Sequence, residues 1–258
     1  MGLDLDAIRR KLARLQGNTG KNLLWKPKEP GTFMVRLVPI QAAIDETGLP
    51  ILERQFYYNF GKTVQAPCQF GDADPVAETL AGFQAEGDNS MWKHLAPKAR
   101  DFAAVIVRGE EDTGVRFWSL NKQASTRLMS FFLKDDIGDI IDVHKGFDLE
   151  VSFEKTSMEN GRSWMKPTID VSRKSSKLAK TQKQIDEWCN NIPNIDDVYA
   201  MPSYSELENM LKRWSNGFNN TDDGTAKGES QPAETTTASG TAMDKLNSAF
   251  GDLNLDSE

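Results

Sequence analysis

The chain has 258 residues, of which 38% are hydrophobic, and it carries a formal net charge of −7. This length allows one large domain or two small ones, and the hydrophobic content is enough for a core but low for a chain that is folded throughout. No apolar run approaches the roughly 20 residues of a membrane helix, the N-terminus lacks the apolar centre of a signal peptide, and two distant cysteines (Cys68 and Cys189) form no disulfide framework, so we expect a soluble intracellular protein with reduced thiols.

The acidic charge is concentrated towards the C-terminus. Residues 1–20 carry four cations and two acids, residues 21–180 carry 22 of each, and residues 181–258 carry five cations and 14 acids. Within the balanced part, residues 162–183 hold seven cations and one acid. A basic segment followed by an acidic tail is typical of a protein that binds a polyanion while its tail competes for the same surface, although a solvated basic surface is the alternative.

The first 20 residues predict a basic N-terminal arm. Leu5, Ile8, Leu12 and Leu15 have the spacing of one helix face, and Gly17 and Gly20 end the helix. Such a helix is too short to be stable alone, so it either docks on a neighbouring molecule or packs on its own domain. The cations to which we assign docking, and therefore cooperative binding, are Arg9, Arg10, Lys11 and Arg14.

Residues 31–40 and 51–60 predict two strands, and residues 102–120 predict a β-hairpin around a polar, glycine-flanked turn. In the second strand of this hairpin, alternation places Trp118 on one face with Arg116 and Leu120, and Lys122 continues that set. A flat ring between cations suits an unpaired nucleic-acid strand, because bases stack on the ring and phosphates meet the cations. The alternative is a core hairpin with a snorkelling arginine.

The next segments repeat this theme. Residues 123–133 predict a helix with Arg127 near its start, residues 147–153 alternate as a strand with one wet face, and an Asn-Gly pair predicts a hairpin that returns through Ile169. Trp164 lies between two cations in alternate register. The complete set of residues predicted to contact DNA is Lys98, Arg100, Phe102, Arg116, Trp118, Lys122, Arg127, Arg162, Trp164, Lys166, Arg173 and Lys174.

The C-terminal part divides into a helix and a tail. Residues 203–214 predict a helix with a Leu207, Leu211, Trp214 stripe, whereas residues 216–258 have eight acids, two cations and almost no apolar surface until their end. We expect this tail to be disordered. Its apolar residues among acids predict a partner-binding tip, with a purely solubilising tail as the alternative: Leu246, Phe250, Leu253 and Leu255.

With these residues in view, the chain resembles the helix-destabilising, single-stranded DNA-binding proteins of T-even phages and their cyanophage relatives. The resemblance rests on IRRKLARL, FMVRLVP, the block KARDFAAVIVR through GVRFWSLNK, the phrase IPNIDD and the tail ending in GDLNLDSE. It implies a five-stranded barrel of the oligonucleotide-binding (OB) type, a basic arm for cooperative polymerisation and an acidic arm for replication partners. The strand patterns by themselves predict only a small antiparallel β domain.

Two departures from the family pattern change what we expect. Well-known members hold a structural zinc with one His and three Cys in the stretch that corresponds to residues 61–78, where this chain has only Cys68. We therefore predict no zinc and no other cofactor, and a subdomain held together by Phe60, Phe70, Val76 and Leu80. In the family motif a run of basic residues is followed by Ser or Thr, whereas the basic run of this N-terminal arm is followed by Leu12. Arg173-Lys174-Ser175-Ser176 matches that motif more closely.

The sequence therefore predicts an α+β protein, mainly β with flanking helices, in three parts: the arm (1–20), an OB-type core (21–215) and the tail (216–258). We expect it to coat single-stranded DNA without sequence preference during phage replication, recombination and repair, in the cytoplasm of an infected bacterium. Its expected partners are single-stranded DNA, further copies of itself along the DNA, and phage polymerase, helicase and recombination proteins, with no membrane.

Three alternatives to this function are considered. An acidic-tailed interaction scaffold explains the tail but not the two tryptophan-centred basic sites, and an RNA-binding OB protein is the other binding module. An enzyme is not expected, because no P-loop, no H-E-x-x-H and no nucleophile-base arrangement is present. The acids that a nuclease could use for magnesium flank Gly138 in what the sequence indicates is a solvated loop: Asp135, Asp136, Asp139 and Asp142.

Overall fold

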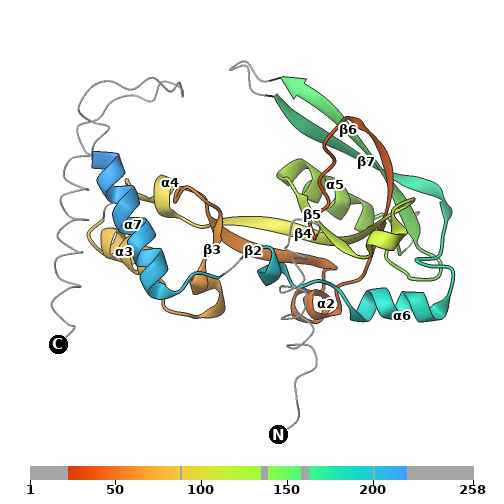
Figure 1. Cartoon of the computed structure of the whole chain (residues 1–258), viewed down its shortest axis with the longest axis horizontal. Coiled ribbons are helices and arrows are strands. Elements are labelled where there is room, and N and C mark those ends of the chain that lie inside the picture. The colour runs from red at the N-terminus through yellow and green to blue at the C-terminus, as the bar shows by residue number, and fades with distance from the viewer. Residues whose placement is uncertain (1–22, 88, 135–138, 158–162, 200, 220–258) are drawn as a thin grey trace, which may run out of the picture. The chain divides into compact units, whose positions relative to one another are not determined.

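The computed structural model describes residues 23–87, 89–134, 139–157, 163–199 and 201–219 (Figure 1). The chain forms two compact units. Among the described residues, the first unit contains residues 23–54 and those of 100–198, and the second contains those of 55–99 and of 199–219. Each unit is described separately below.

The described residues form a mixed α and β structure, so the predicted α+β class is confirmed. The strands are β1 (Gly31–Leu37), β2 (Ile51–Tyr57), β3 (Val64–Gln65), β4 (Lys98–Val107), β5 (Arg116–Leu120), β6 (Phe147–Ser157) and β7 (Ser163–Ser175). The helices are α2 (Gln41–Thr47), α3 (Pro75–Ala85), α4 (Trp92–Leu95), α5 (Lys122–Phe132), α6 (Gln182–Asn190) and α7 (Tyr204–Asn219). Short 3-10 turns are η2 (Pro67–Phe70), η3 (Glu111–Thr113) and η4 (Ile195–Asp197).

The strands form one mostly antiparallel sheet in the order β3-β2-β4-β1-β6-β7, with β5 paired to β4. The sheet has seven strands, and no pairing among the described residues closes it. The strand pairing of the described residues therefore does not confirm the expected five-stranded OB-type barrel. The additional strands are β2 and β3, which come from the long connection between β1 and β4.

In the first unit, β1 is the central strand. Val35 lies opposite Val107 of β4 on one side and opposite Leu149 of β6 on the other, and both pairings are antiparallel. β5 pairs with β4, and β7 pairs with β6 along nearly its whole length, so the order in this unit is β5-β4-β1-β6-β7 (Figure 1). A parallel bridge from Leu24 to Phe117 adds the segment before β1 to the β5 edge.

Alternate residues of these strands build one hydrophobic core. The alternation expected for β6 is confirmed, since Leu149, Val151 and Phe153 are buried while Glu150 is exposed. Burying one such large apolar side chain contributes about 1.5 to 3 kcal/mol. The other strand residues in this core are Val35, Leu37, Ile51, Ala103, Val105, Val107, Trp118, Leu120 and Ile169.

Helix α5 packs over this core and contacts both outer strands of this unit, β5 and β7. It begins where the Asn121 side chain accepts a hydrogen bond from the amide of Ala124 at 2.8 Å, an N-cap that satisfies one of the first unpaired amides. Ala124, Leu128 and Phe131 are buried on one face, and the helix contacts both β5 and β7. A helix, and not a strand pairing, therefore lies between these two outer strands.

The second unit has its own core, made by the end of β2, β3, α3, α4 and α7. Asp74 is the N-cap of α3, accepting hydrogen bonds from the amides of Val76 and Ala77, and Pro75 occupies the first helical position. Val76 and Leu80 are buried in this core and Phe60 packs against it, as expected. The prediction for Phe70 is wrong, because that side chain is 46% exposed.

None of the helices in the described ranges combines the length and the apolar character needed to cross a membrane.

Candidate nucleic-acid interface

A cationic hollow lies in the first unit beside β5. Its volume is about 580 Å³, and we call it the Arg116 hollow. It is lined by Leu24, Trp25, Lys26, Pro27, Lys28, Glu29, Pro30, Phe33, Glu110, Thr113 and Arg116. The lining thus brings three cations and two carboxylates around aromatic side chains.

The segment before β1 forms one wall of this hollow because it is tied to β5. The amide of Trp25 donates to the carbonyl of Phe117 at 2.7 Å, and the amide of Phe117 donates to the carbonyl of Leu23 at the same distance. The Trp25 ring is buried edge-on against Phe33, with centroids 5.7 Å apart. Two prolines follow, and their fixed φ angles restrict the segment that carries Lys26 and Lys28.

Arg116, the predicted cation of the β4–β5 pair, is already engaged in this hollow. Its Nη2 lies 2.6 Å from Oε2 of Glu110, and its side chain is only 11% exposed. Its Nε is buried without a hydrogen-bond partner among the described residues. A phosphate that reached Arg116 would compete with the Glu110 carboxylate, so this contact is weaker than that of an unpaired arginine.

Trp118 and Phe102 do not lie on an exposed surface. Trp118 is 3% exposed and packs edge-on against Trp25, with ring centroids 5.4 Å apart, while Phe102 is fully buried against Phe117. The shared face of Trp118 and Leu120 was predicted correctly, but that face points into the core. Because no ring face is accessible to a base, we reassign Trp118 and Phe102 to the core.

Trp164 occupies a different environment near the start of β7. It is half-buried, lies opposite Thr156 of β6, and shares a strand face with Lys166, which is exposed opposite Glu154. It has no place in the core of the first unit. A ring that is held by its strand while part of it meets solvent fits the base-stacking role predicted for it.

The remaining predicted cations differ in how much they are already paired. Arg127 on α5 bonds to Asp170 at 3.0 Å and to the carbonyl of Ile169 at 3.2 Å, and its guanidinium stacks 4.5 Å from the Phe131 centroid. Arg100 on β4 is half-buried. The predicted cations with exposed side chains on the strands and at the start of α5 are Lys98, Lys122, Lys166, Arg173 and Lys174.

Several predicted residues lie outside the described ranges. These are Arg162 of the second tryptophan site, the arm cations Arg9, Arg10, Lys11 and Arg14, and the tail residues Leu246, Phe250, Leu253 and Leu255. Their assignments remain predictions.

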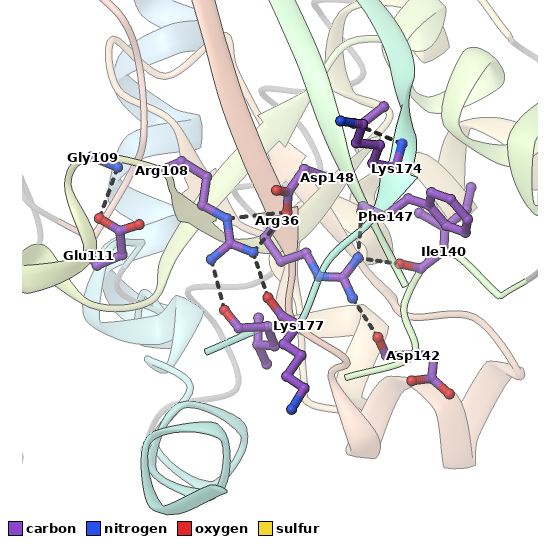
Figure 2. A network of polar contacts seen from close by, with 12 residues as sticks. Arg36, Arg108, Gly109, Glu111, Ile140, Asp142, Phe147, Asp148, Lys174 and Lys177 are labelled. Carbon is purple, nitrogen blue, oxygen red and sulfur yellow. Dashed lines mark hydrogen bonds and ion pairs between the residues drawn. The ribbon is translucent and has the colours of Figure 1, made fainter. Parts of the chain in front are cut away.

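Two arginines that the sequence analysis did not assign form a buried network (Figure 2). Arg36 of β1 is fully buried and donates to the carbonyl of Ile140 at 2.7 Å and to the carbonyls of Phe147 and Asp142. Burial lowers the pKa of Arg36 to about 10, so the group stays protonated at neutral pH. Arg36 is the only charged residue in the apolar stretch of residues 31–40, and this pattern could have indicated a structural role. An arginine that is buried with its strand needs several hydrogen-bond acceptors around it.

Arg108 extends the network to the end of β7. Its guanidinium pairs with Asp148 at 2.8 Å and donates to the carbonyls of Lys177 and Leu178, each at 2.8 Å. Figure 2 shows the Arg36 and Arg108 guanidinium groups pointing towards different loops. Arg36 and Arg108 therefore hold residues 140–147 and the segment after β7 in place. Their terminal nitrogens are already hydrogen-bonded within the protein, so neither arginine is assigned to DNA.

The stretch that the family resemblance associates with zinc contains a hydrogen-bonded cluster in the second unit. Asp74 accepts from the Tyr57 hydroxyl at 2.9 Å and from the amide of Cys68 at 3.2 Å, in addition to the helix amides. Burial, followed by the Asp74 carboxylate, raises the pKa of Cys68, so its thiol holds its proton. No group of three potential metal ligands occurs among the described residues.

Comparisons of the chain with protein-family models, with curated proteins and with solved structures return no match. Function is therefore argued from the residues and the fold.

Proposed function

We propose that this protein binds single-stranded DNA without sequence preference, as a non-enzymatic coating protein, through an OB-type barrel in its first unit. The observation that carries the proposal is the order in which the strands of this unit pair. β1 pairs with both β4 and β6, β5 pairs with β4, and β7 pairs with β6.

This order matches the Greek key of the OB fold when β1, β4, β5, β6 and β7 are taken as strands one to five. In that fold a partly open barrel of five strands is common. The position of α5 supports the assignment, because the helix follows the third strand and contacts both β5 and β7, at the place where the barrel stays open. The second unit is then an insertion between the first and second barrel strands.

OB folds bind oligonucleotides over their second and third strands and through the loops that follow the first and fourth strands. Here the second and third strands are β4 and β5, and the Arg116 hollow lies at the start of β5, where Glu110 and Thr113 of the β4–β5 connection also line it. The loop after the fourth strand is the β6–β7 connection, next to which Trp164 and Lys166 lie. Aromatic and cationic side chains thus occupy the two regions where the proposal needs them.

We assign phosphate contacts to Lys98, Arg100, Arg116, Lys122, Arg127, Arg162, Lys166, Arg173 and Lys174, and base stacking to Trp164. Stacking on a ring favours unpaired strands and is tolerant of sequence, since every base has a π-face. The basic arm (1–20) supplies cooperative contacts between neighbouring copies, and the acidic tail (216–258) recruits replication and recombination proteins. Both of these assignments rest on the sequence.

The test measures binding of the full chain to labelled oligothymidylate, to a duplex and to a single-stranded RNA. Fluorescence polarisation gives the affinity for each at a series of salt concentrations. We expect tightest binding to single-stranded DNA. Trp164→Ala should weaken binding by about 5- to 160-fold without changing the salt slope, because it removes stacking. Lys166→Ala should lower the slope by about 0.7, because it removes one phosphate contact.

Lys145→Ala is the matched control, because Lys145 is an exposed lysine of the same unit that lies outside the barrel strands and outside the basic segment of residues 162–183. It should leave both affinity and slope unchanged. Equal or tighter binding to the duplex would contradict the proposal, and tighter binding to RNA would identify an RNA-binding protein instead. Absence of binding at low salt would favour a scaffold that binds only proteins.

A further inference from the structure

The second unit contains a separate hollow of about 500 Å³, which we call the Trp214 hollow. It is formed by the connection between β2 and β3 and by one face of α7, and is lined by Asn59, Phe60, Gly61, Lys62, Met210, Arg213 and Trp214. This volume lies within the range of roughly 300 to 1,000 Å³ that is usual for small-molecule sites. No role was assigned to this hollow above.

One wall of the Trp214 hollow is aromatic. The rings of Phe60 and Trp214 meet edge-on, with centroids 6.4 Å apart, and the centroid of the tilted His94 ring lies 6.3 Å from that of Trp214. Phe60 and Trp214 pack against the core of the second unit while they line the hollow, so core contacts hold each ring in position. A supported ring beside open space can receive a flat ligand by stacking.

The hollow is also cationic. Lys62 and Arg213 are both exposed, and the residues of the described chain that line the hollow include no acid. Of the nearby α7 carboxylates, Glu208 pairs with Lys212 at 2.8 Å and Glu206 accepts from the amide of Ser203 at 2.9 Å. The charge of Lys62 also contributes to the lowered pKa of Glu206. The Nε of Arg213 donates to the carbonyl of Asn209 at 3.2 Å, which holds its guanidinium near the hollow.

The backbone at Gly61 brings ring and charge together. Its φ is 77°, in the left-handed region that favours glycine, so the chain turns sharply between Phe60 and Lys62. Both neighbours consequently line the same hollow. An aromatic wall next to two exposed cations fits a ligand that has a flat ring and an anionic group at a short distance from it.

We propose that the Trp214 hollow binds one nucleotide of single-stranded DNA, with the base against Trp214 and Phe60 and the phosphate against Lys62 and Arg213. This inference rests on the proposed function, and it adds a contact site in a unit outside the OB-type strands. The hollow should accept any base. Asn59 is the one uncharged polar side chain among its described lining residues, and its amide already donates to the carbonyl of His94, so little is left to distinguish one base edge from another.

The test uses the full chain labelled with 5-fluorotryptophan and followed by ¹⁹F NMR. The Trp214→Phe variant assigns the Trp214 resonance, and the buried Trp188 of α6 serves as an internal reference, because it lines neither hollow. On addition of oligothymidylate of about eight nucleotides, within the usual site size of an OB-fold protein, the Trp214 resonance should shift while that of Trp188 stays in place.

Exposed cations provide variants that leave folding intact. Lys62→Ala and Arg213→Ala should each lower the salt slope of oligothymidylate binding by about 0.7, whereas Lys93→Ala, an exposed lysine of α4 outside the lining, should not. Equal melting temperatures of the three variants would show that binding alone has changed.

The outcomes separate this inference from the proposed function. If the oligonucleotide binds but the Trp214 resonance does not move, the hollow is no nucleotide site and the proposed function stands. If no oligonucleotide binds at low salt, the proposed function fails. If a synthetic peptide of residues 243–258 shifts the Trp214 resonance and the oligonucleotide does not, the hollow binds an acidic peptide and the inference is overturned.

Discussion

Replacing Trp118 by alanine should destabilise the protein without removing a DNA contact. The side chain is 3% exposed, and its ring packs edge-on against Trp25 at 5.4 Å and against Phe153 at 6.4 Å between centroids. Truncation leaves a cavity among these rings, which costs about 3 to 5 kcal/mol for a buried tryptophan. At about 2 to 4 °C per kcal/mol for a chain of this size, the melting temperature should fall by roughly 6 to 20 °C.

Trp164→Ala should have the opposite profile. This ring is half-buried on β7 and does not belong to the core of the first unit, so its removal should cost about 1 kcal/mol of stability or less. If it stacks on a base, the affinity for single-stranded DNA should fall by about 1 to 3 kcal/mol. The two tryptophans, which sequence patterning treats alike, should therefore separate into a stability residue and a binding residue.

The assay combines thermal unfolding followed by circular dichroism with fluorescence polarisation of labelled oligothymidylate, measured well below the unfolding transition. Trp118→Leu serves as a second variant, because it retains apolar bulk and keeps the core filled in part. The reasoning is refuted if Trp118→Leu melts like the parent protein and yet loses as much affinity as Trp164→Ala. That result would mean that the Trp118 ring reaches DNA.

Four further predictions follow from the structure and the sequence. Gly146→Ala should lower the melting temperature, because a Cβ there would overlap the Arg36 guanidinium and neighbouring carbonyls; an unchanged melting temperature would contradict the role of the network. Deletion of residues 1–17 should abolish cooperative binding on long strands, measured by titration, and leave binding to a short oligonucleotide nearly unchanged; loss of both would place the arm in the domain itself. Removal of residues 216–258 should raise DNA affinity at low salt, with a gain that shrinks as salt screens the competition, and an effect absent at every salt concentration would reduce the tail to a tether. Glu206→Gln should destabilise α7 at neutral pH, because hydrogen bonds from Ser203 to the Glu206 carboxylate lower its pKa and so stabilise the folded state. The parent protein loses this stabilisation as the pH falls through the lowered pKa. The unfolding curves of the parent and the variant should therefore converge in acid.

Local patterns were sufficient to predict most elements of the first unit. The expected helix over residues 123–133 is α5, and the alternating strand over residues 147–153 is the first part of β6. These predictions succeeded because the period of a strand or an amphipathic helix depends on neighbours within a few residues.

The outcome at Phe70 shows the limit of reasoning from hydrophobicity alone. It was expected to hold the subdomain with Phe60, Val76 and Leu80, but it lies at the end of a 3-10 turn and is 46% exposed. In the same unit, a buried hydrogen bond from the Tyr57 hydroxyl to Asp74 joins β2 to the start of α3. Sequence distance hides this pair, because 17 residues separate the two side chains.

The sequence by itself determined which side chains of a strand share a face, where the chain turns, and how charge is divided between the balanced middle and the acidic end. The tertiary structure alone decided which face is inside. Trp118 is buried because Trp25, from before β1, and Phe153, from β6, cover it. Arg36 is buried because carbonyls more than 100 residues later in the chain accept its hydrogen bonds. The physical reason is that burial depends on partners brought together by long-range strand pairing, and no local pattern contains them.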